Sequence, residues 1–211
     1  MQAQKIKSKR DPQLEVNVYQ GHIATKNCHT SHYIDITSMK HEHVMAREAA
    51  MAIAARYSYF TQIDTIVCID GSEVIGAFLA YHLTEKGNWY LNAKKNIGVV
   101  PTEFDAEDKL VFRDNLTYMI DGKNVLLLIS TVKSGKTIAR VLEALKGYGA
   151  VVQGIATVFS TTEELEGIPV YSLFTREDLP DYVYASAEEC PMCAEGKKID
   201  AIANSYGISK L

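Results

Sequence analysis

Apolar residues along the chain form short blocks with two different spacings. A continuous apolar run occupies Thr65–Ile69, and mainly apolar runs occupy Asn124–Ile129, Val151–Phe159 and the shorter Pro169–Phe174. Runs of this kind are typical of parallel strands that are buried on both faces. We therefore predict a strand at each of these positions, and a further strand at Asn88–Asn92.

Between these runs, apolar positions recur at helical spacing. The pattern predicts helices over Lys40–Phe60, Val74–Thr84 and Lys136–Tyr148, with Ser38 as the N-cap of the first and Gly149 ending the third. Strands that alternate with helices indicate an α/β fold, in which a parallel twisted sheet is flanked by helices and joined by right-handed crossovers.

Outside the alternating blocks the pattern is weaker. Residues 1–14 are polar and lysine-rich, and we expect a flexible N-terminal segment before a main domain over residues 15–187. Residues 93–115 lack periodicity, and a loop of this length in a compact domain is usually functional or mobile. Residues 188–211 read as a C-terminal tail with a short helix at Lys198–Tyr206.

Composition and charge narrow the class of protein. The 211 residues are 47% hydrophobic and 23% charged, which suits one α/β domain with a sizeable core. A formal net charge of -4 gives no general basic field for nucleic acid or an anionic membrane, so we expect neither as a partner. The chain shows no bilayer-length apolar run and no apolar signal-peptide stretch, so we expect a cytoplasmic protein. An anionic small ligand would need a local cluster of donors.

Such a cluster follows the predicted strand at Asn124–Ile129. Hydroxyl groups, a glycine, two lysines and the start of a helix meet there, and this combination suits a phosphate group. The candidate phosphate-binding residues are Ser130, Thr131, Val132, Lys133, Ser134, Gly135, Lys136 and Thr137. An ordinary strand-to-helix turn capped by Ser or Thr is the simpler alternative.

A Walker A loop is a further alternative for this segment. Gly135-Lys136-Thr137 matches the end of that motif, but Ser130 stands where its first glycine belongs. No later strand ends in an obvious aspartate for magnesium. A P-loop NTPase is therefore a minor alternative.

A second polar turn, Asp70-Gly71-Ser72-Glu73, follows the predicted strand at Thr65–Ile69. Ligands of parallel sheets bind at the carboxyl ends of the strands, so this turn and the phosphate-loop candidates are expected to border one cleft. The alternative role for Asp70 and Glu73 is N-terminal capping of the next helix.

The segment Val125–Thr137 resembles the phosphoribosyl pyrophosphate (PRPP) loop of type I phosphoribosyltransferases, and the order of other segments resembles the orotate phosphoribosyltransferase branch. These segments are Gly21-His22-Ile23, Ser31–Asp35, Val67–Gly76, Tyr90–Lys95, Lys123-Asn124, Gly147–Gly154 and the Cys-Pro-Met-Cys tail. The resemblance implies the family's sheet with a small N-terminal element as a hood. It also implies PRPP bound with Mg²⁺, transfer of phosphoribose to a nucleobase such as orotate, and a homodimer.

The resemblance also implies roles for individual residues. The phosphate-loop candidates would hold the 5′-phosphate, and Asp70, Gly71, Ser72 and Glu73 would form the pyrophosphate turn. Lys94, Lys95, Lys109 and Arg113 would contact pyrophosphate from the aperiodic segment.

The chain departs from the family's pattern at two positions. Ile129 and Ser130 stand where the family has two adjacent acidic residues that bind the ribose hydroxyls. Each lost charge-assisted hydrogen bond costs roughly 1.5–3 kcal/mol. A second hypothesis is therefore a catalytically impaired relative that binds a phosphorylated metabolite in a regulatory or structural role.

Cys190 and Cys193 have the Cys-x-x-Cys spacing that supplies half of a structural zinc site. The other ligands could be Cys28 with His29 or His32, if the tail folds back onto the N-terminal element. A reduced or redox-active thiol pair, or a tight turn without metal, are the alternatives.

Overall fold

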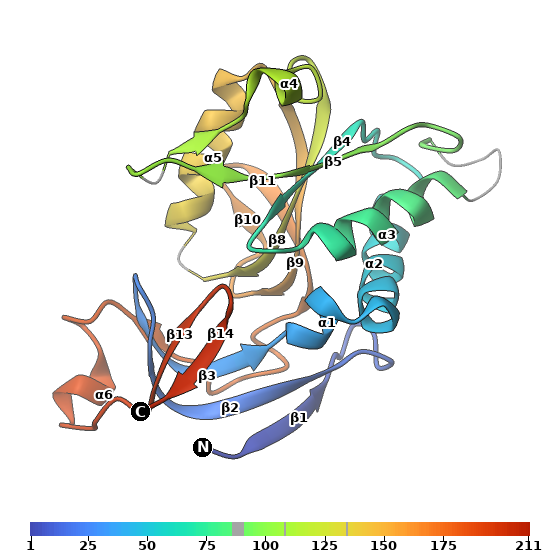
Figure 1. The fold of residues 1–211 in the computed structure, drawn as a ribbon. Coiled ribbons are helices and arrows are strands. Elements are labelled where there is room, and N and C mark those ends of the chain that lie inside the picture. The colour runs from blue at the N-terminus through green and yellow to red at the C-terminus, as the bar shows by residue number, and fades with distance from the viewer. Residues whose placement is uncertain (86–90, 108, 134) are drawn as a thin grey trace.

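The computed structural model describes residues 1–85, 91–107, 109–133 and 135–211. Figure 1 shows two six-stranded sheets, one flanked by helices and one below it that contains both ends of the chain. We call these the main sheet and the hood. The hood packs across one end of the main sheet, and this junction positions the site described below.

The main sheet confirms the predicted α/β architecture. Its strand order is β10-β11-β9-β8-β4-β5, and its pairings are parallel except that β10 runs antiparallel to β11. The strands are β4 (Thr65–Ile69), β5 (Gly98–Pro101), β8 (Asn124–Val132), β9 (Val151–Ser160), β10 (Glu164–Leu165) and β11 (Ile168–Phe174). Each of the mainly apolar runs of the sequence is a strand here, because a strand covered on both faces has few solvent-facing positions.

Helices α2 (His43–Tyr57) and α3 (Glu73–Glu85) cover one face of the main sheet, and α5 (Lys136–Gly147) covers the other. The shorter helices are α1 (Thr37–His41), α4 (Asp114–Thr117) and α6 (Pro191–Ala194), of which α6 lies beside the hood in Figure 1. Leu126 and Leu128 of β8 pack into a core with α2 and α3, whereas Leu127 faces α5 on the other side. In the described part of the chain, no helix has the length and apolar character needed to cross a membrane.

The first predicted helix is two helices, and Ser38 is not its N-cap. Glu42 has an extended backbone that separates α1 from α2, and Ser38 lies inside α1, where its carbonyl accepts the Glu42 amide at 2.8 Å. The N-cap position of α1 belongs to Ile36. Met39 and Ala46 are both fully buried on either side of the break, so the apolar spacing runs through it and hides it.

The aperiodic segment contains more structure than expected. It includes β5, a small hairpin of β6 (Glu103–Phe104) and β7 (Leu110–Val111), and the start of α4. Of the strand expected at Asn88–Asn92, residues 88–90 lie outside the described residues, and the following residues form a turn. The buried Asn92 side chain secures this turn, because it accepts the Ile63 amide at 2.9 Å and donates to the Thr61 carbonyl at 2.8 Å.

The hood is assembled from both ends of the chain. Its strands are β1 (Ala3–Lys7), β2 (Glu15–Ala24), β3 (His29–Asp35), β12 (Tyr184–Ala185), β13 (Ala201–Asn204) and β14 (Gly207–Lys210). One edge of β2 pairs with β3, while the other is shared by β1 along its first half and β13 along its second.

The two terminal regions correct the sequence-based expectations. The segment expected to be flexible includes β1, and the helix expected at Lys198–Tyr206 is instead the β13–β14 hairpin. Burial alternates with period two along β13, which is a strand pattern. The Asn204 side chain accepts the amides of Tyr206 and Gly207, and this turn reverses the chain where a helix would continue it.

The buried Ser8 side chain ties the N-terminal segment to the main sheet. Its hydroxyl donates to the Leu173 carbonyl at 2.5 Å and accepts the amides of Arg10 and Asp11. We expect Ser8→Ala to lower the unfolding free energy by about 1–2 kcal/mol, because it leaves these buried groups without a partner. Urea denaturation measures this change, with Ser209→Ala, at an exposed position in β14, as the control. Equal stabilities of the two variants would contradict the prediction.

Candidate functional site

A cavity of about 460 Å³ lies between the carboxyl end of the main sheet and the hood. One side is formed by the end of β8 and the loop that leads into α5, and Asp70 after β4 adjoins it. The hood contributes the β2–β3 turn over residues 25–28, the inner face of β3 and the turn of the β13–β14 hairpin. The cavity is therefore at the position where parallel sheets bind ligands.

The loop between β8 and α5 presents backbone and side-chain donors to the cavity. Gly135 occupies the N-cap position of α5 with a left-handed φ of 71°, and no described side chain caps the helix there. The first amides of a helix are free in this situation and attract an anion. Lys133 and Thr137 line the cavity on either side of Gly135. Of the predicted phosphate-binding residues, Ser134 lies outside the described residues.

The base of the loop is fixed by β9. The Thr161 hydroxyl donates to the Lys133 carbonyl at 2.9 Å, and the Thr161 amide donates to the Val132 carbonyl at 3.2 Å. Ser130, Thr131 and Val132 belong to β8 itself, so the loop proper begins at Lys133. This attachment gives the donors a fixed position before any ligand arrives.

Charged groups inside the cavity perturb one another. Burial lowers the pKa of Lys133 below the ordinary 10.5, while the nearby Asp70 carboxylate favours its charged form. Burial raises the pKa of Asp70, which Lys40 and Lys133 oppose. Lys40 itself is buried in α1, and its ammonium group donates to the Ser205 carbonyl of the hood at 2.6 Å. The α1 lysine thus joins the hood to the turn after β4.

The turn after β4 has an unusual backbone. Asp70 and Gly71 have φ values of 58° and 73°, and a non-glycine residue in this region costs about 1–2 kcal/mol. The Ser130 hydroxyl donates to the Asp70 carbonyl at 3.1 Å, and the buried Ser72 hydroxyl donates to the Leu128 carbonyl at 3.0 Å. Strand β8 thus fastens the turn, and Ser72 bonds the backbone of the main sheet. Glu73 begins α3, and within the turn Asp70 is the residue that lines the cavity.

Ile129 and Ser130 lie near the end of β8, at the two positions where the family pattern has acidic residues. Ile129 lines the cavity, is only 3% exposed and packs into the core on the α5 side of the sheet. Ser130 is 5% exposed and uses its hydroxyl on the Asp70 carbonyl. Neither position can supply a carboxylate to a ligand.

The structure separates Lys94 and Lys95 from the cavity. Lys95 Nζ lies 3.7 Å from Asp64 Oδ1, and Asp64 directly precedes β4, whereas the cavity begins after β4 at Asp70. The five residues of that strand put roughly 16 Å between its two ends. Lys94 adjoins Lys95 in the same turn, where its amide donates to the Thr84 carbonyl.

Lys109 and Arg113 belong to the region of the β6–β7 hairpin. Lys109 pairs with Glu107 at 2.5 Å, and Arg113 forms a two-pronged ion pair with Glu103, with one bond of 2.9 Å. Both pairs are exposed. Phe104 of the same hairpin lines the cavity, so the hairpin reaches the site through an aromatic ring instead of a cation.

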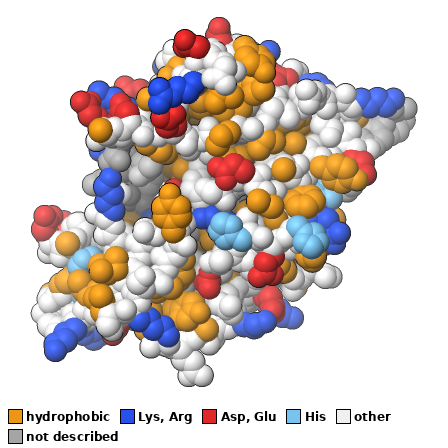
Figure 2. Space-filling model, in the orientation of Figure 1, with side chains coloured by type: hydrophobic (Ala, Val, Ile, Leu, Met, Phe, Trp, Pro, Cys, Tyr) orange, Lys and Arg blue, Asp and Glu red, His pale blue; other side chains and the backbone are white. Residues whose placement is uncertain are grey.

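Several cavity residues were not anticipated from the sequence. Among the described lining residues the basic ones are Lys26, Lys133 and Arg140, against the single acidic Asp70. The cavity is thus locally basic, although Figure 2 shows acidic and basic side chains interspersed over the face it displays. The helical spacing could have predicted Arg140 as a cavity residue, because it lies three residues after Thr137 and so on the same face of α5. No local sequence pattern predicts the hood residues of the cavity, because tertiary contacts between distant segments bring them there.

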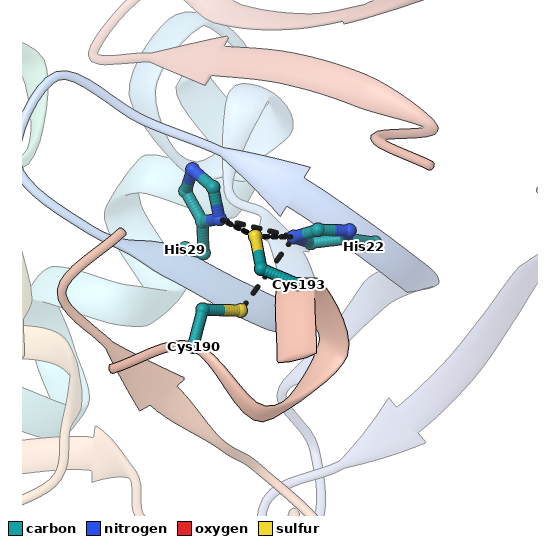
Figure 3. A group of neighbouring side chains, drawn as sticks. All are labelled: His22, His29, Cys190 and Cys193. Atoms are coloured by element: carbon teal, nitrogen blue, oxygen red, sulfur yellow. Dashed lines mark hydrogen bonds between the residues drawn. The ribbon is translucent and has the colours of Figure 1, made fainter. Parts of the chain in front are cut away.

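A separate cluster lies on the outer part of the hood, where His22, His29, Cys190 and Cys193 point toward one another (Figure 3). The structure thus corrects the ligand set expected for the Cys-x-x-Cys pair, because Cys28 and His32 are not in the cluster. The Cys28 thiol contacts the Thr25 hydroxyl at 3.3 Å, and His32 bonds Ser31 at 2.7 Å. On a two-residue-period strand, His29 faces away from both Cys28 and Thr30.

Comparisons with known proteins agree on one family. A model of the phosphoribosyl transferase domain matches residues 35–189. The orotate phosphoribosyltransferase of Chlorobium phaeobacteroides is 27% identical over 188 residues, which cover 86% of each chain. The residues matched by the family model include the strands of the main sheet and the loop before α5.

Solved structures support the fold. Orotate phosphoribosyltransferase of Mycobacterium tuberculosis, in complex with Fe(III) dicitrate, superposes with a TM-score of 0.53 at 15% identity, covering 78% of this chain and 92% of that one. Adenine phosphoribosyltransferase of Trypanosoma brucei gives a TM-score of 0.53 at 12% identity, covering 83% and 80%. The expected parallel sheet with flanking helices is confirmed as the type I phosphoribosyltransferase fold.

Proposed function

The chain belongs to the phosphoribosyltransferase family, and from this premise we propose that its cavity binds PRPP or a related sugar phosphate and transfers phosphoribose to a nucleobase such as orotate. The observation that carries the proposal is the uncapped start of α5, which opens into a basic cavity at the carboxyl end of the main sheet. The 27% identical orotate phosphoribosyltransferase supports orotate as the first base to test.

The 5′-phosphate is assigned to the loop before α5. Free helix amides, the Lys133 ammonium group and the Thr137 hydroxyl can together satisfy several phosphate oxygens. Gly135 lets the loop pack closely against Leu165, which a side chain at this position would meet. Attachment of the loop to β9 through Thr161 limits the entropy lost on binding.

The pyrophosphate end and its magnesium ion are assigned to the side of the cavity that holds Asp70. Mg²⁺ prefers oxygen ligands and is usually held by one or two carboxylates together with substrate phosphates. Asp70 can supply such a carboxylate, and the neighbouring Lys133 limits repulsion of the incoming phosphates. Magnesium bound there would neutralise the charge that develops on departing pyrophosphate.

The base is assigned to the side of the cavity enclosed by the hood. Tyr33, His32 and Tyr182 line this region together with Phe104 from the β6–β7 hairpin, and flat aromatic surfaces suit a planar base. His32 and Tyr182 stack with ring centroids 6.2 Å apart. Arg140 and Lys26 bring positive charge to the lining, which favours an anionic base such as orotate over a neutral one.

A second candidate function rests on Ile129 and Ser130. Without carboxylates at these positions the ribose hydroxyls lose two charge-assisted hydrogen bonds, which slows transfer but leaves phosphate binding intact. The protein would then bind a phosphorylated metabolite in a regulatory or structural role.

Calorimetric titration with PRPP and with ribose 5-phosphate, each with and without Mg²⁺, tests binding. An assay of PRPP-dependent orotate consumption then tests transfer. Binding together with turnover supports the proposed transferase, and binding without turnover favours the second candidate. Failure to bind either sugar phosphate would overturn both.

The half-buried Lys133 allows a prediction of how binding depends on pH. Its pKa lies below 10.5, so phosphate affinity is full while the amine is protonated and falls as the pH rises through that lowered pKa. Over the same window the unfolded chain binds more protons than the folded chain, so the unfolding free energy rises with pH. We expect Lys133→Arg to keep its affinity where the wild type loses it, because the guanidinium stays charged. Titration of ribose 5-phosphate from pH 7 to alkaline pH measures this, and parallel curves for both proteins would count against it.

A further inference from the structure

The cluster of His22, His29, Cys190 and Cys193 has the composition of a closed metal site. The potential ligand atoms all lie within 4.8 Å of one another, and they come from β2, β3 and the segment around α6 (Figure 3). His22 and Cys190 are each 2% exposed. All four cysteines of the chain are free thiols, so the pair is available as ligands.

We propose that these four side chains bind one structural Zn²⁺ ion. Zinc prefers four tetrahedral nitrogen and sulfur ligands, with Zn–N of about 2.0–2.1 Å and Zn–S of about 2.3 Å. Such bonds place two nitrogens about 3.3 Å apart and a nitrogen and a sulfur about 3.6 Å apart. His22 Nε2 lies 3.0 Å from His29 Nδ1 and 3.6 Å from each cysteine sulfur, and Cys193 Sγ lies 3.2 Å from His29 Nδ1.

The hydrogen bond on the far side of His22 supports this assignment. His22 Nδ1 lies 2.9 Å from the Lys197 carbonyl, which can only accept, so Nδ1 carries the proton and Nε2 presents a lone pair to the cluster. This is the arrangement that orients histidines bound to zinc. One proton shared with His29 or a thiol would satisfy a single contact of Nε2, whereas a metal ion at the centre satisfies all four side chains.

The backbone around the cysteines forms a compact turn. Cys190 is the N-cap of α6, Pro191 begins the helix, and the Ala194 amide donates to the Cys190 carbonyl at 3.0 Å. The Gly196 amide donates to the Cys193 carbonyl at 2.9 Å. This turn brings both sulfurs to one side, as two ligands of one ion require.

The proposed ion connects two segments that are distant in sequence, one of which adjoins the cavity. It joins the β2–β3 hairpin to residues 190–193, and the turn of that hairpin, residues 25–28, lines the cavity. The His22 amide also donates to Asp200 at 2.7 Å, just before β13. With two cysteines and two histidines the coordination is complete, so the ion stabilises the hood and performs no chemistry on substrate.

Metal content of the purified full-length chain tests the proposal directly. We expect one zinc per chain by elemental analysis, and about 100-fold or greater loss of zinc affinity in Cys193→Ser. Cys28→Ser is the matched control, because Cys28 adjoins His29 but lies outside the cluster, and it should keep its zinc. Loss of zinc in Cys28→Ser but not in Cys193→Ser would overturn the assignment.

Cobalt substitution provides a readout of geometry. Wild-type protein stripped of metal and titrated with Co²⁺ should develop the visible bands of a tetrahedral ion and thiolate charge-transfer absorption. Cys193→Ser should lose part of the charge-transfer band, and because Cys193 is exposed, this variant is expected to fold. Absence of zinc in the wild type together with absence of a tetrahedral cobalt spectrum would overturn the proposal.

Limited proteolysis tests the structural role. Removal of zinc should speed tryptic cleavage after Lys26, in the turn of the hairpin, and added zinc should restore the slower rate. A cleavage rate unaffected by zinc would overturn the structural role. These measurements need no sugar phosphate, so they stand or fall independently of the transferase.

Discussion

Replacement of Lys133 by methionine is expected to weaken binding of PRPP and ribose 5-phosphate by about 10- to 150-fold at neutral pH. Lys133 lines the cavity beside the open start of α5, where it can form a charge-assisted hydrogen bond to a phosphate oxygen. Loss of such a bond costs roughly 1.5–3 kcal/mol, which sets this range. Calorimetric titration of both ligands measures the change.

The Lys133→Met variant should lose affinity for sugar phosphates without losing unfolding free energy. Burial lowers the pKa of Lys133, which means that the folded protein holds its charge at a cost. A methionine of similar size removes that cost, so the unfolding free energy should stay equal or increase. Lys146→Met, at the other end of α5, is the control and should leave affinity unchanged. Equal affinities of Lys133→Met and wild type would rule out Lys133 as a phosphate ligand.

Replacement of Gly135 by valine is expected to lower the unfolding free energy by about 2–5 kcal/mol and to impair phosphate binding. Gly135 has a φ of 71°, and a non-glycine residue with this backbone conformation loses about 1–2 kcal/mol of stability. A β-branched residue such as valine fits this conformation least well. A Cβ there would also come within 2.5 Å of the Leu165 side chain, and crowding of this kind costs about 1–3 kcal/mol. Thermal and urea unfolding measure the loss.

Gly147 provides a matched control on the same helix. It is the last residue of α5, has helical backbone, and has no atom within 4 Å of the position a Cβ would take. Gly147→Val should therefore change stability by less than about 0.5 kcal/mol. Similar destabilisation by both substitutions would show that the backbone conformation at Gly135 is not the cause.

The main sheet could be predicted from the sequence because its signals are local. Strands β4, β8, β9 and β11 are mainly apolar runs, and α3 and α5 follow their strands with regular apolar spacing. The break at Glu42 could not be predicted, because burial of Met39 and Ala46 preserves the helical spacing across it. Strands β1, β13 and β14 of the hood were missed for a different reason: they are short, and β13 pairs with β2, which is remote in sequence.

The candidate site also contains residues that the local sequence predicts and residues that only tertiary contacts bring together. The phosphate loop was predictable because a strand, a glycine and a helix start adjoin in sequence. Lys94 and Lys95 were expected at the cavity from family resemblance, but the turn fastened by Asn92 keeps them beside Asp64, at the other end of β4. The cysteine pair was recognised by its spacing, whereas His22 was not, because only the pairing of β2 with β3 brings its ring next to that of His29. The homodimer and the cytoplasmic location stay predictions.

The pairing of β13 with β2 has a consequence during protein synthesis. Ala201 pairs with Ile23, so the second half of one β2 edge has to wait for residues made almost a whole chain later. The main sheet can be completed on the ribosome as soon as Phe174 has emerged, while that part of β2 still exposes unpaired backbone groups. An unpaired edge is a site for association between chains. Ribosomes that follow one another closely on one message would therefore bring such edges together, and fast translation of the last segment would protect the nascent protein.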